Sequence, residues 1–397
     1  MLKGKTILLG VSGSIAAYKM ADLASQLVKA HAEVHVLMTR NACQFITPVT
    51  FETLTGHKCI VDTFDRQFEF QVEHVSLAQQ ADLFLVAPAT ANIIGKIAAG
   101  ICDDMLTTTL MACHAPKVIA PAMNVNMWDN PILQGNIRKL KAYGYDFVMP
   151  VSGRLACGDT GRGKLAPVNT LFERILSWVA LPHDMEGTQV LISAGPTCEA
   201  IDPVRFITNH SSGKMGYALA KIAKLRGAEV LLVSGPVHLE PFEGVTVVPV
   251  RQAAEMHEEV MRNAVEADYV VMCAAVADYT PLTYTDHKIK KGEGDLSLPL
   301  KRTTDILAEL GANKRPGQRI IGFSMETDDL IAHSRQKLER KHVDLICANS
   351  LTSEGTGFGV DTNRITLVSP NGVETLPLCS KEETANLIWD RVLHLEK

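Results

Sequence analysis

Short apolar runs alternate with longer amphipathic stretches along this chain, and the same order of segments begins twice. Residues 4–10 form a β-rich apolar run that ends in glycine, and residues 187–195 repeat this plan in the middle of the chain. Both runs are typical of the first strand of a parallel sheet. Each is followed by a helical pattern and a second apolar strand, at 16–29 and 33–39 in the first half and at 215–226 and 229–234 in the second. The pattern therefore predicts a βαβ unit in each half.

Further apolar runs extend both predicted sheets. Near the C-terminus, 364–368 and 373–376 flank Asn371-Gly372, which suits a tight hairpin turn and predicts a small antiparallel flap. The polar stretch 293–297 fits no regular element and is predicted to be a mobile loop. The remaining strands are predicted at 83–88, 117–121, 246–250, 269–274, 319–323 and 343–348, and further helices at 253–267 and 328–340.

Residues 181–187 separate the two patterns. This segment carries Pro, Gly and charges without periodicity, which is typical of a linker. At 397 residues the chain is also longer than a single core usually serves. We therefore predict two Rossmann-like α/β domains, over 1–180 and 188–397, joined by 181–187.

Charge and composition narrow the function classes. The 39 Lys and Arg against 44 Asp and Glu give a net charge of -5, so no overall basic field exists to hold a polyanion, and we expect no nucleic-acid partner. The longest apolar stretches fall far short of the ~20 residues that span a bilayer, so we expect no membrane segment. The 9 cysteines are scattered without a CxxC pair, which fits a reducing cytoplasm better than a disulfide framework or a cysteine zinc site.

Small and hydroxyl-bearing residues follow two predicted strands of the first half. Residues 10–14 precede a helical pattern, so their backbone amides are suited to a phosphate at the start of that helix, and residues 87–92 end another strand in the same way. Together they predict a cradle for one phosphorylated planar cofactor. Taken alone, 10–14 fits equally well a tight turn capped by serine. It departs from GxGxxG, so it does not predict a dinucleotide fingerprint.

Three other segments of the first half carry candidate chemistry. His74 is a natural proton acceptor near neutral pH, although a bland role is the commoner one for any single histidine. Residues 121–128 follow a predicted strand and contain two side-chain amides, one of them Asn124, next to Met and Trp side chains. This pattern fits either a shaped ligand pocket or ordinary packing. Cys157 lies in a Gly-rich loop over 152–164, where a thiol is accessible. The GxxxxGK match at 158–164 lacks the following Ser or Thr and is interpreted as a decoy.

In the second half the candidate residues favour an anionic ligand. Residues 209–216 open a helix with serines, glycines and a lysine, which suits phosphate. Asp278 ends a buried strand, where a carboxylate either bridges a metal to polyphosphate or serves the structure. Lys288, Lys290 and Lys291 would ordinarily be a solvated charge run, but they lie in the predicted loop, where a triphosphate would need its charge neutralised. With Lys337 and Lys341 they form a local excess of positive charge.

Taken together, these motifs resemble, over nearly the full length, the bifunctional enzymes of coenzyme A biosynthesis that combine phosphopantothenoylcysteine decarboxylase with phosphopantothenate-cysteine ligase. Their order and their placement in the two halves make the resemblance specific. The motifs are GSIAAYK at 13–19, His74, APATAN at 87–92, PAMNVNMW at 121–128, ACGD at 156–159, SAGPT at 193–197, NHSSGKMG at 209–216, AAVADY at 274–279, KIKK at 288–291 and residues 344–349.

For the first half, the resemblance implies a flavodoxin-like flavoprotein domain of the cysteine decarboxylase type. His74 would be the base that assists thiol oxidation, Asn124 would hold the substrate carboxylate, and Cys157 would donate a proton in the final reduction to 4′-phosphopantetheine. FMN is the implied cofactor, with Phe45 packing against its ring. The implied FMN-binding residues are Ser12, Gly13, Ser14, Thr39, Phe45, Thr90 and Asn92.

For the second half, the resemblance implies a ligase that joins cysteine to 4′-phosphopantothenate through an acyl-cytidylate, with CTP as co-substrate and Mg²⁺ held by Asp278. Asn209 would position the mixed anhydride, and Lys288 would meet the charge on the triphosphate. Family nucleotide contacts match Thr304, Asp305, Ile306, Leu307, Phe323, Lys337 and Lys341. The resemblance also implies a cytoplasmic homo-oligomer, with trimeric contacts between flavin halves and dimeric contacts between ligase halves.

The sequence departs from the family pattern at three places, none of which removes a residue assigned to bond making. These are Cys102 before Asp103-Asp104, Thr303-Thr304-Asp305, and Ser324-Met325. Two other functions compete with this interpretation. An NAD(P)-dependent enzyme is disfavoured by the missing GxGxxG, and a flavin-binding regulatory protein without turnover is disfavoured by the joint presence of His74, Asn124 and Cys157.

Overall fold

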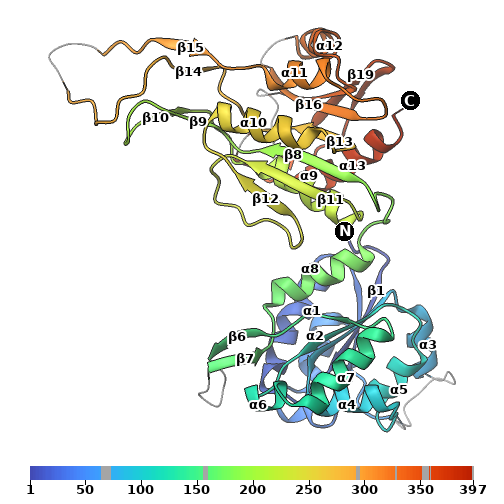
Figure 1. The fold of residues 1–397 in the computed structure, drawn as a ribbon. Helices are drawn as coiled ribbons and strands as arrows, with labels where there is room; N and C mark the ends of the chain where they lie inside the picture. Colours follow the sequence, from blue (N-terminus) through green and yellow to red (C-terminus); the bar gives the residue numbers. More distant parts are fainter. Residues whose placement is uncertain are drawn as a thin grey trace. The chain divides into compact units, whose positions relative to one another are not determined.

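The computed structural model of the chain divides into two compact units, Met1–Pro182 and His183–Lys397, and each is an α/β unit (Figure 1). None of the helices in the described part of the chain combines the length and the hydrophobicity that a bilayer crossing requires. The structure describes residues 1–63, 73–154, 160–291, 296–326, 329–350, 357 and 359–395.

The N-terminal unit is built on a five-stranded sheet in the order β2-β1-β3-β4-β5. All neighbouring strands run parallel. This is the flavodoxin-like order. The chain adds β2 on one side of β1 and then crosses to add β3 on the other side, and ligands of such folds bind at this switch point between β1 and β3. The strands are β1 (Thr6–Val11), β2 (Glu33–Met38), β3 (Leu83–Ala89), β4 (Lys117–Pro121) and β5 (Asp146–Phe147).

Helices cover both faces of this sheet, which is why its strands read as continuous apolar runs. All seven residues of β3 are buried. Leu8 joins Phe84 and Ile93 in one core cluster, while Ile7, on the opposite face by alternation, is also fully buried. The helical elements are η1 (Ile15–Tyr18), α1 (Lys19–Lys29), η2 (Ala42–Gln44), α2 (Pro48–Thr55), α3 (Glu73–Gln80), α4 (Ala91–Ala99), α5 (Met105–Ala112), α6 (Val125–Trp128), α7 (Pro131–Ala142) and α8 (Val168–Val179).

The C-terminal unit contains an eight-stranded sheet in the order β12-β11-β8-β13-β16-β17-β19-β20. The first six strands of this order run parallel, and the last two are antiparallel and form the hairpin predicted around Asn371-Gly372. The strands are β8 (Gln189–Ala194), β11 (Glu229–Ser234), β12 (Thr246–Pro249), β13 (Tyr269–Met272), β16 (Arg319–Glu326), β17 (Leu345–Ser350), β19 (Ile365–Ser369) and β20 (Gly372–Thr375).

Close packing of helix on strand explains one glycine in this unit. A Cβ on Gly216 would lie 2.6 Å from the Cβ of Ala194, so α9 approaches β8 only because residue 216 has no side chain.

The two sheets confirm the predicted fold class, which is two Rossmann-like α/β domains with a C-terminal antiparallel flap. The helices are α9 (Lys214–Leu225), α10 (Ala253–Ala264), α11 (Ile306–Ala312), α12 (Leu330–Lys341) and α13 (Lys381–Leu393).

Several short antiparallel pairs were not predicted. The loop expected over 152–164 begins and ends in a hairpin of β6 (Val151–Arg154) and β7 (Thr160–Lys164), so Lys164 ends a strand and does not open a helix. The predicted loop 293–297 lies mostly outside the described residues. The other pairs are β9 (Cys198–Ala200) with β10 (Phe206–Thr208), β14 (Tyr279–Pro281) with β15 (Leu300–Arg302), and β18 (Thr362–Asn363) with β21 (Cys379–Ser380).

Part of the segment 181–187 is packed against the C-terminal unit. The side chain of Met185 is fully buried. Asp184 accepts two bonds from Arg226, at 2.8 Å from Nε and 2.6 Å from Nη2. The Arg226 guanidinium lowers the pKa of Asp184, because its charge and hydrogen bonds favour the carboxylate. Asp184 and Met185 therefore belong structurally to the unit that follows them.

Candidate functional site

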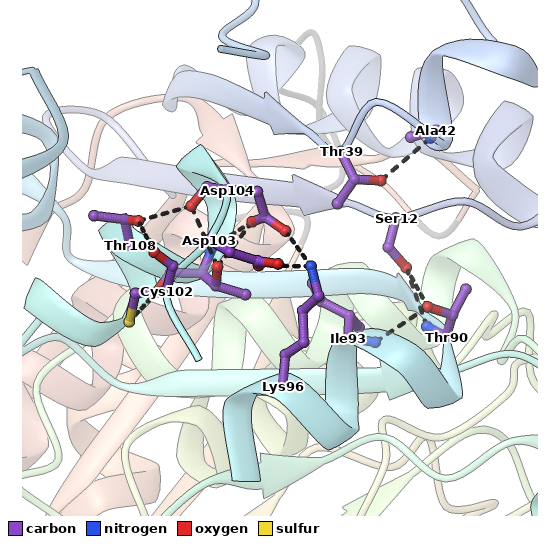
Figure 2. Close-up of polar contacts among 11 residues, drawn as sticks. Ser12, Thr39, Ala42, Thr90, Ile93, Lys96, Cys102, Asp103, Asp104 and Thr108 are labelled. Carbon is purple, nitrogen blue, oxygen red and sulfur yellow. Dashed lines mark hydrogen bonds and ion pairs between the residues drawn. The ribbon is translucent and has the colours of Figure 1, made fainter. Parts of the chain in front are cut away.

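In the N-terminal unit, hydrogen bonds join the loop after β1 to the end of β3 and the loop that follows it. The Ser12 hydroxyl donates to the Pro88 carbonyl at 2.7 Å and accepts from the Thr90 backbone N–H at 3.0 Å. Thr90 in turn caps α4, since its Oγ1 accepts from the N–H of Ile93 at 3.3 Å (Figure 2). The carboxyl ends of the two strands are thus held in one arrangement at the point where ligands bind in such sheets.

A cavity of about 740 Å³ opens at this edge. Its size is within the range of ligand pockets, roughly 300–1,000 Å³. A Cβ on Gly13 would lie 2.6 Å from the Cβ of Asn41, so the loop after β1 passes the loop after β2 only with glycine at this position. The structure brings together here all of the residues that the resemblance assigned to FMN: Ser12, Gly13, Ser14, Thr39, Phe45, Thr90 and Asn92.

The residues present fit a flavin nucleotide. Ser14 caps η1 and Thr90 caps α4, and Ser12 lies beside them on the cavity wall, so that hydroxyls and backbone N–H groups suited to a phosphate gather here. Phe45, with nearly half of its surface exposed, lines the cavity together with Met123 and Met127 and offers an apolar surface for a planar ring.

Charged residues on the rim of this cavity were missed by the sequence reasoning. Lys96 contacts Asp103 at 2.6 Å and Asp104 at 3.1 Å, and all three line the cavity (Figure 2). Burial by itself would lower the pKa of Lys96, but the two carboxylates outweigh it and raise that pKa. The lysine therefore stays charged beside the cavity. The only signal in the sequence was the Asp103-Asp104 pair after a glycine that ends a helix.

The three residues predicted to act on the substrate have different positions. His74 is the second residue of α3 and is half-buried, and Asn124 caps α6 by accepting from the N–H of Asn126 at 2.9 Å. Asn124 directly follows Met123, which lines the cavity, whereas His74 and Asn124 are not among the described residues of the lining. Cys157 lies outside the described residues.

A second cavity, of about 470 Å³, lies at the carboxyl ends of β13 and β16 in the C-terminal unit. Lys341 contacts Asp305 at 3.0 Å, and Asp305 caps α11 through the N–H of Ala308 at 3.1 Å. Burial would raise the pKa of Asp305, but Lys341 and the Ala308 N–H lower it overall. The predicted residues that line this cavity are Asp278, Thr304, Asp305, Ile306, Leu307, Phe323 and Lys341.

Asn209 adjoins this second site. Its side-chain amide donates to the carbonyls of Ala275 and Val276, at 3.1 and 3.2 Å, and Val276 lines the cavity. Thr303 fixes the facing loop, because its hydroxyl donates to the Ala277 carbonyl at 2.6 Å and its N–H donates to the Asp278 carbonyl at 3.0 Å. The departure from the family pattern at Thr303 is therefore a loop anchor.

The predicted cations other than Lys341 do not line the cavity in the described part of the chain. Lys337 lies one turn before Lys341 on α12. Lys288 is exposed, and the neighbouring Ile289 backbone is anchored by Asp202 at 3.1 Å and by Arg205 at 2.7 Å. An exposed carboxylate such as Asp278 fits Mg²⁺, which commonly binds one or two carboxylates together with substrate phosphates.

The other two departures from the family pattern lie in different surroundings. Ser324 is buried on β16, with its hydroxyl 3.3 Å from that of Ser334 on α12. Cys102 is exposed, and its thiol contacts the carbonyl of Thr107 at 3.8 Å. It lies beside Lys96, Asp103 and Asp104 (Figure 2). Neither side chain is among the described lining residues of the two cavities.

Comparison with known proteins agrees with this division. Residues 1–180 match the family model described as Flavoprotein, and residues 185–395 match the DNA/pantothenate metabolism flavoprotein C-terminal domain. The chain is 48% identical over 401 residues to the coenzyme A biosynthesis bifunctional protein CoaBC of Bacillus subtilis, covering 100% of this chain and 98% of the relative. It is 45% identical over 389 residues to the protein of the same name from Vibrio cholerae, covering 98% and 97%.

Among solved structures, the C-terminal domain of a coenzyme A biosynthesis bifunctional protein CoaBC is 42% identical, covers 52% of this chain and 95% of its own, and has a TM-score of 0.45. The fold, the site and the family models define a two-unit α/β flavoprotein. More particularly, the chain belongs to the family of bifunctional coenzyme A biosynthesis proteins. The family predicted from the sequence is confirmed.

Proposed function

We propose that the N-terminal unit is an FMN-dependent phosphopantothenoylcysteine decarboxylase and that the C-terminal unit is a CTP- and Mg²⁺-dependent phosphopantothenate-cysteine ligase. The observation that carries the proposal is the cavity between the loops after β1 and β3. It gathers hydroxyls, helix-start N–H groups and the exposed Phe45 at the switch point of a flavodoxin-like sheet. The full-length similarity to bifunctional relatives supports the pairing of the two activities.

In the N-terminal unit, bound FMN supplies an electron acceptor for the substrate thiol, which lets the neighbouring carboxylate leave as carbon dioxide. Ser12 and Thr90 hold the loops that would bind the phosphate of FMN, and Phe45 would pack against its ring. His74 takes the proton released when the thiol is oxidised, and Asn124 holds the carboxylate. The enethiol left after loss of carbon dioxide would regain the two electrons from the reduced flavin, and Cys157 would donate the proton that accompanies this reduction and completes 4′-phosphopantetheine.

In the C-terminal unit, the carboxylate of 4′-phosphopantothenate attacks CTP and displaces pyrophosphate, and cysteine then displaces CMP from the acyl-cytidylate. Asp278 would hold Mg²⁺, which would orient the phosphates, while Lys341, Lys337 and Lys288 would offset their charge. Phe323 and the 304–307 loop form the nucleotide pocket. Asn209 stands beside this pocket, bonded to Ala275 and Val276, and positions the anhydride.

The first test is the visible spectrum of the purified chain together with carbon dioxide release from phosphopantothenoylcysteine. We expect a flavin spectrum and turnover. His74→Gln should retain the spectrum and lose turnover, and Cys157→Ser should retain the spectrum and form less product. A colourless protein that cannot be reconstituted with FMN would overturn the assignment of this half.

The second test is nucleotide competition in the ligase reaction with cysteine and 4′-phosphopantothenate. We expect CTP to support product formation, Asp278→Asn to raise the Mg²⁺ requirement, and Lys288→Gln to weaken nucleotide use more than Lys290→Gln does. Equal use of every nucleoside triphosphate would contradict CTP selectivity.

We also propose a cytoplasmic homo-oligomer with trimeric contacts between flavin halves and dimeric contacts between ligase halves. The free state of every cysteine in the described part of the chain is consistent with a reducing compartment. Native mass spectrometry of the full chain tests the assembly, and a monomer at working concentration would contradict it.

A further inference from the structure

Two histidines and a glutamate converge outside both cavities. Glu33 and His35 lie two residues apart on β2 and therefore on the same face of that strand, and His57 follows the end of α2. Oε1 of Glu33 is 3.3 Å from Nε2 of His57 and 3.7 Å from Nε2 of His35. The two imidazole rings lie against each other, with centroids 4.4 Å apart. One ligand atom from each residue lies within 4.8 Å of the other two.

This cluster is remote from the proposed flavin cavity. None of the three residues lines the cavity, whose nearest lining residues along the chain are Thr39, just past the far end of β2, and Val61. Thr39 is six positions from Glu33 and four from His35, and Val61 is four positions from His57. Six residues of extended strand span about 20 Å. The cluster therefore stands at the opposite edge of the sheet and takes no part in the decarboxylation chemistry.

The backbone around the cluster is well anchored. β2 is paired with the central strand β1, where Thr6 faces Glu33 and Leu8 faces His35. The N–H of His57 donates to Oγ1 of Thr55 at 3.2 Å, which fixes the turn after α2. The three side chains thus project from a sheet and a capped helix end, so the site is largely formed before any ligand binds.

We propose that Glu33, His35 and His57 form a zinc-binding site with a fourth position open to water. Imidazole nitrogen and carboxylate oxygen are established Zn²⁺ ligands, and bonds of roughly 2.0–2.2 Å in a tetrahedron place ligand atoms about 3.3 Å apart. The observed separations of 3.3 and 3.7 Å are close to this spacing. The side chains of His35, His57 and Glu33 are 16%, 35% and 54% exposed, so an ion reaches them from solvent.

Bound zinc would tie the turn after α2 to the start of β2. The ligand residues that it would join, Glu33 and His57, are 24 positions apart in the sequence. Because the ion binds the folded arrangement and not the separated ligands, it stabilises the N-terminal unit in proportion to its occupancy. This gives a readout that is independent of enzyme activity.

The test is titration of the full-length, chelator-stripped protein with Zn²⁺ by isothermal calorimetry. We expect the wild type to bind one equivalent of Zn²⁺ with high affinity that the His35→Gln/His57→Gln double variant does not bind. Each single variant should bind that equivalent at least about tenfold more weakly. His31→Asn is the matched control, because His31 is exposed nearby with φ 66, a conformation that Asn tolerates, and this variant should bind as the wild type does.

Two further measurements separate this site from adventitious binding by cysteines. Co²⁺ can replace Zn²⁺ as a spectroscopic probe. The one equivalent of Co²⁺ that the wild type binds and the double variant does not should show no thiolate charge-transfer band. Zn²⁺ should raise the melting temperature of the wild type and of His31→Asn but not that of the double variant, whose circular dichroism should match the wild type. Equal affinity and stoichiometry in the wild type and the double variant would overturn the proposal, and so would a thiolate spectrum for that equivalent.

Discussion

Ser12 is the residue on which the geometry of the first cavity depends most directly. Its side chain is buried and bonds to the Pro88 carbonyl and the Thr90 N–H. Ser12→Ala leaves both groups without this partner, so we expect a loss of about 1–3 kcal/mol in the free energy of unfolding. Flavin affinity should also fall, because the Thr90 loop is no longer held. Urea unfolding and flavin fluorescence titration measure the two effects.

Thr53→Ala provides the control for this prediction. The Thr53 hydroxyl also donates to a carbonyl, that of Val49 at 2.8 Å, but it does so on the exposed surface of α2. We expect a change within about 0.5 kcal/mol and unaltered flavin affinity. Equal effects of the two substitutions would show that the Ser12 contacts contribute nothing special.

Asp202 makes the anchoring of the segment that carries Lys288 sensitive to acid. Burial alone would raise its pKa, but Arg205 and the N–H groups of Val204, Arg205 and Ile289 outweigh this and hold the pKa well below its ordinary value. A carboxyl whose pKa is lower in the folded state adds stability above its unfolded pKa of about 3.9, and this stability is lost as the pH falls toward the folded value.

We therefore expect Asp202→Asn to be less stable than the wild type near pH 7 and the difference to shrink below about pH 4. Thermal unfolding of both proteins across this range measures it. Hydrogen exchange at Ile289, whose N–H donates to Asp202 at 3.1 Å, should be faster in the variant at neutral pH. A stability difference that does not depend on pH would contradict the assignment.

Residues at strand ends were predictable because parallel strands deliver their carboxyl ends to one edge. Ser12 and Thr90 are 78 positions apart, yet the strand pattern alone placed them together. The Lys96 cluster was not predictable in this way. Lys96 is on α4, and Asp103 and Asp104 follow that helix, so in the sequence these residues resemble an ordinary solvated surface. Only the packing of α4 beside α5 brings them to the cavity.

At the scale of the element, α5 begins at a side chain with two functions. Asp104 caps the helix by accepting from the N–H of Thr107 at 2.9 Å, and it also pairs with Lys96. Asp104→Ala removes both contacts and should cost about 1–2 kcal/mol in urea unfolding. Asp104→Asn keeps an oxygen for the cap, so it should cost less than about 1 kcal/mol. If the two variants are equally destabilised, the ion pair and not the cap dominates.

The long central strands were predicted well, whereas the short antiparallel pairs other than the hairpin at Asn371-Gly372 were missed, for one physical reason. β3 and β11 are enclosed by neighbouring elements, so they read as apolar runs, and the observed β11 has the predicted bounds. The β6–β7 hairpin contains the sequence TGRGK, and its strands are joined by backbone pairing, which leaves no trace in the pattern of side chains. Such exposed polar pairs look like loops in a sequence.

For the whole molecule, the repeated βαβ pattern was enough to predict two units, because each half begins its own sheet. The position of the division was harder to predict. Asp184 and Met185 stand in a stretch without periodicity. Met185 is one buried side chain and Asp184 forms one ion pair, and two such residues are too few to give a recognisable sequence pattern. Only the partner, Arg226 at the end of α9, shows which unit they belong to.

This leads to a prediction about fragments of the chain. The fragment 183–397 retains buried Met185 and the Asp184 contacts to Arg226, whereas 188–397 loses them and leaves the buried Arg226 with Asp390 and Asn386 as its side-chain partners. We expect the longer fragment to have a free energy of unfolding at least about 2 kcal/mol greater. Met185→Ala in the longer fragment should reproduce most of this loss, because it removes the same buried side chain. Urea unfolding compares the three proteins. Equal stability of 183–397 and 188–397 would place the boundary after residue 187 and show that this segment is a linker in solution.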